Sequence, residues 1–279
     1  MAIQVITDST ADIPPETIRQ LNIRIVPIYV RFGDKTYRDG VDIQSEEFYS
    51  MLESSPYHPA TSQPNPEDFV GTYNEYCDSS DGIISIHISS RISGTYSSAA
   101  TAKRTMGTRC PIEVVDSKFN SSGLGLVTVA AARLAQSGAD MHMILDEVHL
   151  AIKEMRMFGM FEHMKYLARS GRVSKAIASA ADFLNVMPLL TFHDGELARA
   201  GFVRKVEKGT DRIYDYVKKN LPISELAIVH SAVLERAELL KEWCSDFIDK
   251  DKITITELGS SLGVHGGPGV LLVAARHSG

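Results

Sequence analysis

The stretch DGIISIHISSRISGTYSSAA, residues 81–100, joins a run of β-branched residues to an alanine-rich segment through a loop dense in hydroxyl side chains. Residues 81–88 predict a buried strand, and the residues after Gly94 predict a helix. Six serine and threonine residues lie between positions 89 and 98 around one arginine, Arg91. A strand, a polar loop and a helix in this order are typical of an α/β fold, in which ligands bind where parallel strands end.

The rest of the chain repeats this alternation of strands and helices. In the first part, strands are predicted at 3–9, 23–32 and 112–117, and helices at 14–22, 45–55, 65–80 and 123–138. Further on, strands are predicted at 154–161, 187–192, 196–204, 225–231, 252–258 and 270–276, and helices at 162–171, 174–185, 209–220 and 233–247. We therefore expect two α/β lobes, residues 1–155 and 156–279, with a mostly parallel sheet in the N-terminal lobe.

Composition narrows the possible functions of the 279-residue chain. A net charge of −6 and scattered basic residues argue against a nucleic-acid partner, which usually requires a basic stripe. Cys77, Cys110 and Cys244 are unevenly spaced and predict neither a disulfide framework nor a zinc site. The chain begins without a signal-peptide pattern and has no apolar run that could span a bilayer, so we expect a cytoplasmic protein.

Two hydroxyl-rich loops are candidate anion sites. Ser93 and Gly94 precede a predicted helix, whose first backbone N–H groups lack helical partners and favour a carboxylate or a phosphate. Thr61 and Ser62 precede another helix start and can add donors from a second loop. The structural alternative is that all of these residues only cap helices and form turns.

Two further segments carry a candidate side chain each. His265 lies in the glycine-rich segment 258–269, which we interpret as a flexible loop that lets a backbone approach a ligand closely. Arg172 follows a predicted helix that ends at Gly171, where it can clamp an anion. Its alternative role is to interact with the carboxyl end of the helix dipole.

Three common catalytic signatures are absent from the sequence. It contains no GxxxxGK[ST], HExxH or GxGxxG segment. This weighs against a self-sufficient enzyme. A hydrolase or phosphotransferase that acts on an ester of a small acid, with Ser93 as nucleophile and His265 as base, stays open as an alternative, as does a binding module for a small acid.

Six separated segments together identify a family resemblance. The chain resembles the DegV family of bacterial fatty-acid-binding proteins in VITDSTADIP (5–14), TSQPNPEDF (61–69), SSRISGTYSSA (89–99), VVDSKFNSSGLG (114–125), YLARSGRVSKA (166–176) and HGGPG (265–269). The resemblance implies two α/β lobes that enclose one fatty acid between them. It also implies a noncatalytic carrier, from which a separate ATP-binding fatty acid kinase subunit makes an acyl phosphate for phospholipid synthesis.

The resemblance also assigns the site residues. Thr61, Ser62, Ser93 and the Gly94 amide are expected to bind the carboxylate, and Arg172 and His265 to lie beside it. It implies no metal and no cofactor besides the bound fatty acid, and transient membrane contact during lipid exchange. The family usually has threonine where this chain has Gly266, so details of headgroup contact are expected to differ.

The tail pocket has one candidate segment. EMRMFGMFEHM, residues 154–164, contains four methionines and two phenylalanines, a composition that suits a pliant surface for a flexible acyl chain. Ordinary core packing is the alternative.

Overall fold

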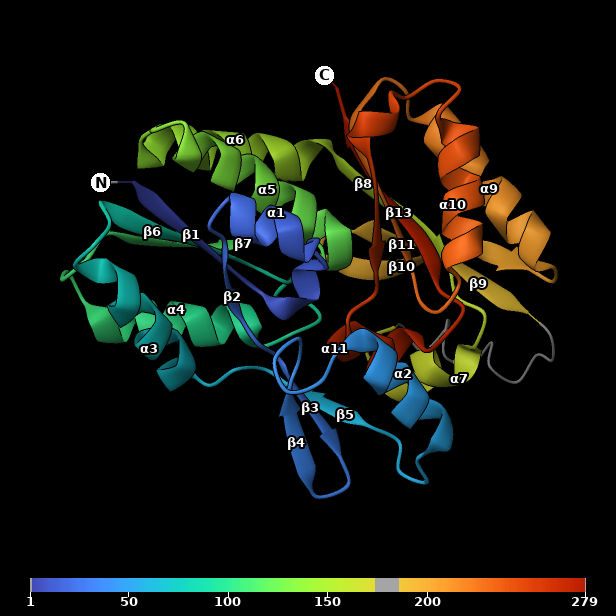
Figure 1. The fold of residues 1–279 in the computed structure, drawn as a ribbon, viewed down its shortest axis with the longest axis horizontal. Helices are drawn as coiled ribbons and strands as arrows, with labels where there is room; N and C mark the ends of the chain where they lie inside the picture. The colour runs from blue at the N-terminus through green and yellow to red at the C-terminus, as the bar shows by residue number, and fades with distance from the viewer. Residues whose placement is uncertain (1, 174–185, 279) are drawn as a thin grey trace.

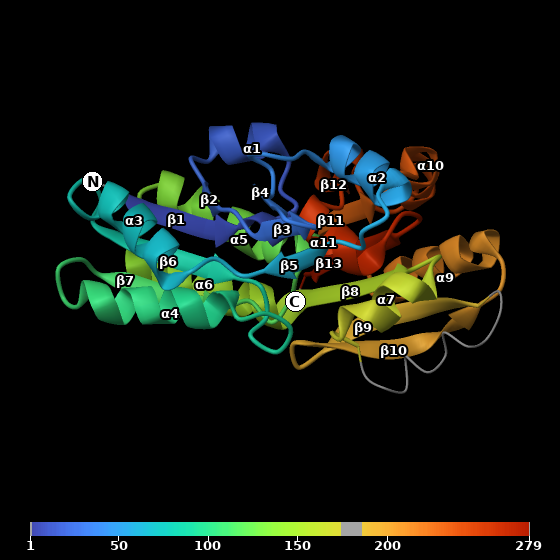
Figure 2. The ribbon, with the colours of Figure 1, turned by 90° about the horizontal axis from the view of Figure 1, so that it is seen from below.

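The computed structural model describes residues 2–173 and 186–278. Its N-terminal sheet consists of four parallel strands in the order β2-β1-β6-β7. The strands are β1 (Ile3–Asp8), β2 (Arg24–Val26), β6 (Gly82–His87) and β7 (Ile112–Asp116). Helices α3 (Pro66–Cys77) and α4 (Thr95–Met106) cover one face, and α5 (Ser121–Gln136) and α6 (Met141–Glu154) cover the other (Figures 1 and 2). The predicted α/β fold with a parallel sheet in this region is confirmed.

A second sheet of six strands has the order β10-β9-β8-β13-β11-β12, and only its β11–β12 pair is parallel. The strands are β8 (Met155–Met160), β9 (Met187–His193), β10 (Glu196–Val203), β11 (Ile223–His230), β12 (Ile253–Glu257) and β13 (Leu271–His277). Helices α9 (Val206–Lys219) and α10 (Leu234–Cys244) pack on its outer face. The helix predicted at 174–185 lies outside the described residues.

Helix α5 lies between the two sheets, and twelve of its sixteen residues are buried. Its buried residues lie on several sides of the helix and include Leu124, Val127, Val129, Ala131 and Ala132. The largest hydrophobic core of the protein includes residues of both sheets. An α-helix without a polar face is stable only when every side of it packs on protein. The six-stranded sheet begins at Met155, but the core continues across this position, so the division of the chain at 155 stays a prediction.

The sequence prediction for residues 23–32 is wrong in one respect, because the expected single strand is two. β2 ends at Val26, and β3 (Tyr29–Phe32) begins a separate antiparallel sheet with β4 (Lys35–Arg38) and β5 (Ala60–Ser62). Pro27 lies at the break, where proline cannot donate a ladder hydrogen bond. Helix α6 was not predicted at all, although Asp140 caps it by accepting a hydrogen bond from the Met143 N–H.

The small sheet and helix α2 (Ser45–Ser54) pack against a helix from the far end of the chain, α11 (Ser260–Gly266). Val264 of α11 joins a core with Val30 and Phe48, and the Tyr49 hydroxyl donates to the Leu258 carbonyl at 3.1 Å. Figure 1 shows α2 and α11 side by side. The remaining described helices are α1 (Pro15–Gln20), α7 (Met164–Ser170) and the 3₁₀ turns Ser9–Ala11 and Lys250–Lys252.

The expected flexible loop around His265 is also wrong, because these residues form α11. A Cβ on Gly263 would lie 2.6 Å from Phe48 Cε1, and one on Gly267 would lie 2.1 Å from Tyr166 Cδ2. Gly267 also has a φ of +72°, which side chains rarely adopt. The glycines therefore allow α11 to pack closely on α2 and α7, and His265 is held by a packed helix.

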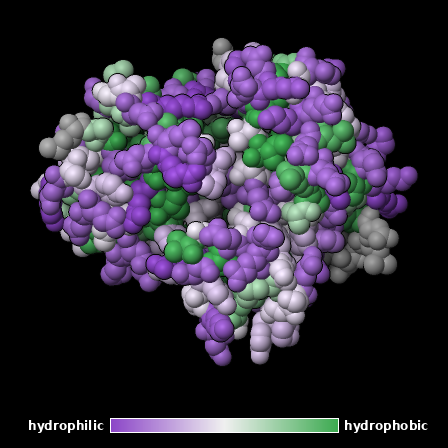
Figure 3. All heavy atoms as spheres, viewed as in Figure 1, coloured by the Kyte–Doolittle hydropathy of each residue, from purple (hydrophilic) through white to green (hydrophobic). Residues whose placement is uncertain are grey.

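Hydrophilic residues cover most of the face shown in Figure 3, with hydrophobic residues in separate patches. Among the helices in the described ranges, none combines the length and apolar character that crossing a bilayer requires.

Candidate ligand-binding site

Two adjoining cavities lie at the carboxyl end of the parallel sheet. The first, which we call the polar cavity, has a volume of about 580 Å³, and all six residues predicted for the site line it. These residues are Thr61, Ser62, Ser93, Gly94, Arg172 and His265. The structure thus brings together positions that four separated segments of the sequence supply.

The second cavity also measures about 580 Å³, and we call it the apolar cavity. Its walls include Met157, Phe161, Leu167, Leu190, Phe192 and Leu262. Four residues of the methionine-rich segment 154–164 line it, namely Met157, Phe158, Gly159 and Phe161. The two cavities share Asn120, Arg172, Leu197, Leu262 and His265 as walls, so a polar compartment opens into an apolar one.

Thr61 and His265 are the contacting pair of the polar cavity. Thr61 Oγ1 lies 2.9 Å from His265 Nε2, although 204 residues separate them in the chain. Strand β5 positions Thr61 and helix α11 positions His265. Burial, followed by the positive charges of Arg172 and His58, lowers the pKa of His265 to about 4, so its imidazole is neutral at pH 7.

Ser93 and Gly94 lie where helix α4 begins. The Ser93 hydroxyl lies 2.9 Å from the Thr95 hydroxyl and accepts from the Thr95 N–H at 3.3 Å. A Cβ on Gly94 would lie 3.1 Å from Gln63 Cδ, so the glycine lets the two hydroxyl loops approach each other. The start of a helix of this length presents unpartnered N–H groups and a positive dipole end, which favour an anion at this wall.

Arg172 follows α7 directly after Gly171, which ends that helix in the left-handed conformation. Its guanidinium donates to the Ser170 carbonyl at 2.6 Å, which holds the tip of the side chain close to the helix end. The residue is exposed yet lines both cavities. Its guanidinium therefore interacts with the helix end and also brings a positive charge to the cavity wall.

Known proteins resemble this chain over nearly its whole length. The family model described as "Uncharacterised protein, DegV family" matches residues 2–277. The chain belongs to the DegV family. A DegV domain-containing protein from Caldanaerobacter subterraneus is 34% identical over 269 residues, which are 95% of each protein.

Solved DegV structures share the whole fold. The structure described as fatty acid binding of a DegV family protein from Thermus thermophilus has a TM-score of 0.91, 29% identity and 100% coverage of both chains. DegV, a fatty acid binding protein from Bacillus subtilis, has a TM-score of 0.88, 31% identity and 100% coverage of both chains. Both of these DegV relatives are thus described as fatty-acid-binding proteins.

Four further polar residues that line this site were not predicted from the sequence. Thr10, Gln63, Asn120 and Ser261 line the polar cavity, and Asn120 also lines the apolar one. Asn120 occupies the N-cap position of α5 without a side-chain capping bond, so its amide is not engaged with the helix. Its signal was an asparagine three residues before the helix predicted at 123–138, within a segment that carried the family resemblance.

The loop before α11 is tied to the N-terminal lobe by one carboxyl group. Asp12 accepts from the Gly259 N–H at 2.9 Å and from the Ser121 hydroxyl at 2.5 Å. Burial raises the pKa of Asp12 to about 8. This residue therefore links the start of α5 to the start of the helix that carries His265.

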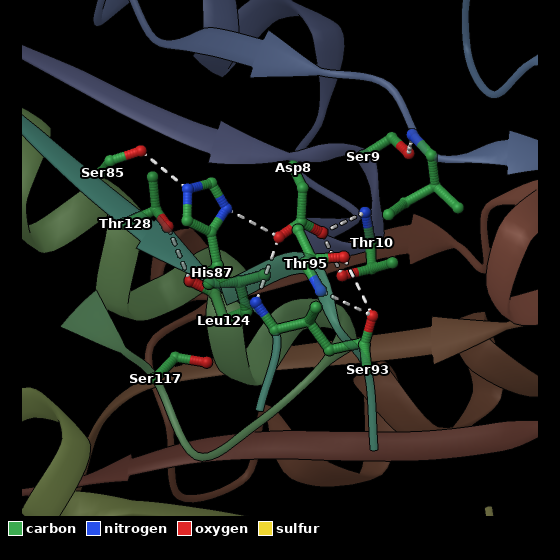
Figure 4. Close-up of polar contacts among 12 residues, drawn as sticks. Asp8, Ser9, Thr10, Ser85, His87, Ser93, Thr95, Ser117, Leu124 and Thr128 are labelled. Atoms are coloured by element: carbon green, nitrogen blue, oxygen red, sulfur yellow. Dashed lines mark hydrogen bonds and ion pairs between the residues drawn. The ribbon is translucent and has the colours of Figure 1, made fainter. Parts of the chain in front are cut away.

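A buried chain of polar side chains supports the floor of the site. His87 Nδ1 lies 2.9 Å from Asp8 Oδ2, and His87 Nε2 lies 2.6 Å from the Ser85 hydroxyl (Figure 4). The Thr10 hydroxyl donates to the same aspartate at 2.5 Å and connects it to the polar cavity. Asp8, Ser85 and His87 have no exposed surface, so this serine–histidine–aspartate arrangement has no access to a substrate.

The enzymatic alternative finds no matching geometry at the cavity itself. In the parts of the chain that the structure describes, the Ser93 hydroxyl pairs with Thr95 and His265 Nε2 pairs with Thr61, and no hydrogen bond joins Ser93 to His265. A nucleophile and its base require that contact. Those same parts contain no cluster of three or more histidine, cysteine or acidic residues that could hold a metal ion.

We expect the stability of ligand-free protein to depend on pH through His265. Its folded pKa of about 4 lies below the unfolded value of 6.5, so below pH 6.5 the unfolded chain binds a proton that the folded chain does not. Stability is therefore lost as the pH falls through this window. Between pH 7 and pH 4.5 the loss that His265 causes is about 2 kcal/mol, which urea denaturation of wild type and His265→Gln will measure as a difference.

His149→Gln, at an exposed position of α6, is the control and should follow the wild type. An identical pH dependence of wild type and His265→Gln would contradict the burial of a neutral imidazole.

Proposed function

We propose that this protein is a noncatalytic carrier of a long-chain fatty acid. The carboxylate occupies the polar cavity, and the acyl chain occupies the apolar cavity. The observation that carries the proposal is the set of shared walls, Asn120, Arg172, Leu197, Leu262 and His265, which makes one amphipathic compartment of the two. DegV relatives described as fatty-acid-binding proteins support the same ligand class.

The energetics fit a carrier of this kind. Burial of a long acyl chain contributes on the order of 10 kcal/mol at about 0.8 kcal/mol per methylene, before entropy losses. Each charge-assisted hydrogen bond to the carboxylate adds about 1.5 to 3 kcal/mol. The apolar cavity therefore sets the affinity, while Thr61, Ser62, Ser93 and the Gly94 amide fix the orientation of the carboxylate.

We further propose that a separate ATP-binding kinase subunit phosphorylates the bound carboxyl group, and that the acyl phosphate feeds phospholipid synthesis. Ser62 and Arg172 are exposed at the polar cavity, which leaves the carboxylate end within reach of a partner. Burial, followed by the positive charges of Arg169 and Lys165, lowers the pKa of His58, so these two side chains contribute a positive field at His58. Such a field suits the added charge of a phosphate group. A cytoplasmic location and brief membrane contact for lipid exchange complete the proposal.

Purified protein tests the carrier role directly. Denaturing extraction followed by mass spectrometry is expected to recover a long-chain fatty acid, and delipidated protein is expected to bind palmitic acid again. ATP alone should yield no acyl phosphate, whereas ATP with the kinase subunit of the source organism should yield it. An empty protein that binds no added acid would refute the carrier role, and product formation without a kinase would refute its noncatalytic character.

Loss of a carboxylate donor is expected to weaken binding about tenfold for each hydroxyl removed. Thr61→Val keeps the shape of the side chain, and Ser93→Ala removes the hydroxyl before α4. Displacement of a fluorescent fatty acid measures the change. Ser97→Ala removes an exposed hydroxyl in the first turn of α4 and should bind like wild type. Equal affinities for all three variants would exclude the assigned orientation.

A further inference from the structure

The apolar cavity adjoins a third space, which we call the outer pocket. It has a volume of about 770 Å³ and shares Met157, Thr191 and Phe192 with the apolar cavity. Its other apolar walls include Phe119, Ile152 and Met155, while Lys118, Arg156 and His193 are exposed at its rim. The outer pocket shares no wall residue with the polar cavity, so of these two cavities it adjoins only the apolar one.

The outer pocket lies where two strands of the six-stranded sheet separate. β8 and β9 pair only from Phe158–Thr191 to Met160–Leu189, although β8 starts earlier, at Met155, and β9 continues to His193. Beyond that point β8 pairs with β13 alone, and β9 pairs with β10 alone. The backbone thus leaves an opening in the sheet, and side chains at that opening separate the two spaces.

The partition consists of two apolar side chains, those of Met157 and Phe192, and of Thr191. Met157 is buried, and a Cβ on Gly123 would lie 2.3 Å from its Sδ, so the thioether rests on the first turn of α5. Phe192 packs on Phe119 with ring centroids 5.5 Å apart. The Thr191 hydroxyl donates to the Met157 carbonyl at 2.7 Å, which fixes the backbone behind them.

We infer that Met157 and Phe192 set the upper limit of acyl chain length in this protein. The inference rests on the proposed function, because it takes the apolar cavity as the acyl site. A chain whose carboxylate lies in the polar cavity reaches this partition with its methyl end. Removal of the partition joins the outer pocket to the acyl site and admits longer saturated chains.

The test compares the binding of myristic, palmitic, stearic, arachidic and behenic acids to delipidated wild type and Met157→Ala. Wild-type affinity should rise with chain length and stop rising when the methyl end meets the partition. In Met157→Ala it should keep rising, by about fourfold for each of at least two further methylenes, because each one enters an apolar space. Met160→Ala is the matched control, since Met160 lies on the same strand, is fully buried and lines neither space.

The outcomes separate the inference from the proposed function. If wild type and Met160→Ala bind palmitic acid and Met157→Ala keeps their chain-length profile, the inference is overturned while the carrier role stands. If no protein binds any of the acids, the carrier role itself fails. If Met157→Ala does not fold, Phe192→Leu is the second variant. It shortens the other large side chain of the partition, so it should also shift the preferred chain length toward longer acids.

Discussion

Replacing Leu197 with glutamate is expected to abolish fatty acid binding while leaving the protein folded. Leu197 is half-buried on β10, an edge strand, and lines both the polar and the apolar cavity. A carboxylate there would repel the ligand carboxylate and would lose hydration when an acyl chain covers it. We expect at least a 100-fold loss of affinity, which corresponds to about 3 kcal/mol of binding free energy.

Phe202→Glu provides the control for this substitution. Phe202 lies on the same strand, exposes 37% of its surface and lines neither cavity. The Phe202→Glu variant introduces the same charge outside the two cavities. It should therefore retain wild-type affinity in fluorescent fatty acid displacement. Wild-type affinity in Leu197→Glu would show that the ligand does not pass between the two cavities.

The largest expected effect on stability comes from Asp8→Ala. The Asp8 carboxylate accepts from the Thr10 N–H at 3.1 Å, the Ile88 N–H at 3.0 Å and the Thr10 hydroxyl, and it pairs with His87 at 2.9 Å. Alanine would leave these buried donors without a partner. We expect the free energy of unfolding to fall by about 4 kcal/mol, measured by urea denaturation.

Asp116→Ala is the natural comparison, because Asp116 ends β7 as Asp8 ends β1. Asp116 accepts from the Ser90 hydroxyl at 2.5 Å and the Lys118 N–H at 2.9 Å, but it is only half-buried, so water can replace it. Its loss should cost about 1 kcal/mol. Equal costs for the two variants would contradict a special role for the buried network.

Local sequence patterns predicted the parts of the structure that local physics controls. Alternating strands and helices predicted the α/β class. Hydroxyl-rich or glycine-rich segments, and for Arg172 the end of a predicted helix, marked the six predicted residues that line the polar cavity. Two errors had visible signals. Pro27 lies at the break of the expected strand, and Asp140 with Ile144 and Val148 marks the start and the buried face of α6.

Other features depend on contacts that no local pattern contains. The glycines around His265 predicted a loop. In the structure Phe48 and Tyr166 pack closely against Gly263 and Gly267, and this packing favours a helix. The Asp8–His87 pair joins residues 79 positions apart. The opening between β8 and β9 depends on which neighbour each strand selects, and hydrophobic periodicity does not specify neighbours.

The contact between Thr61 and His265 bears on when the protein can first hold its ligand. Strand β5 is synthesised before its partner helix α11, because 204 residues separate Thr61 from His265. Chains emerge at about 5–20 residues per second, so a nascent chain carries half of the polar cavity for about 10–40 seconds before the other half exists. The contact between Thr61 and His265, and with it the complete polar cavity, can therefore form only after α11 has been synthesised.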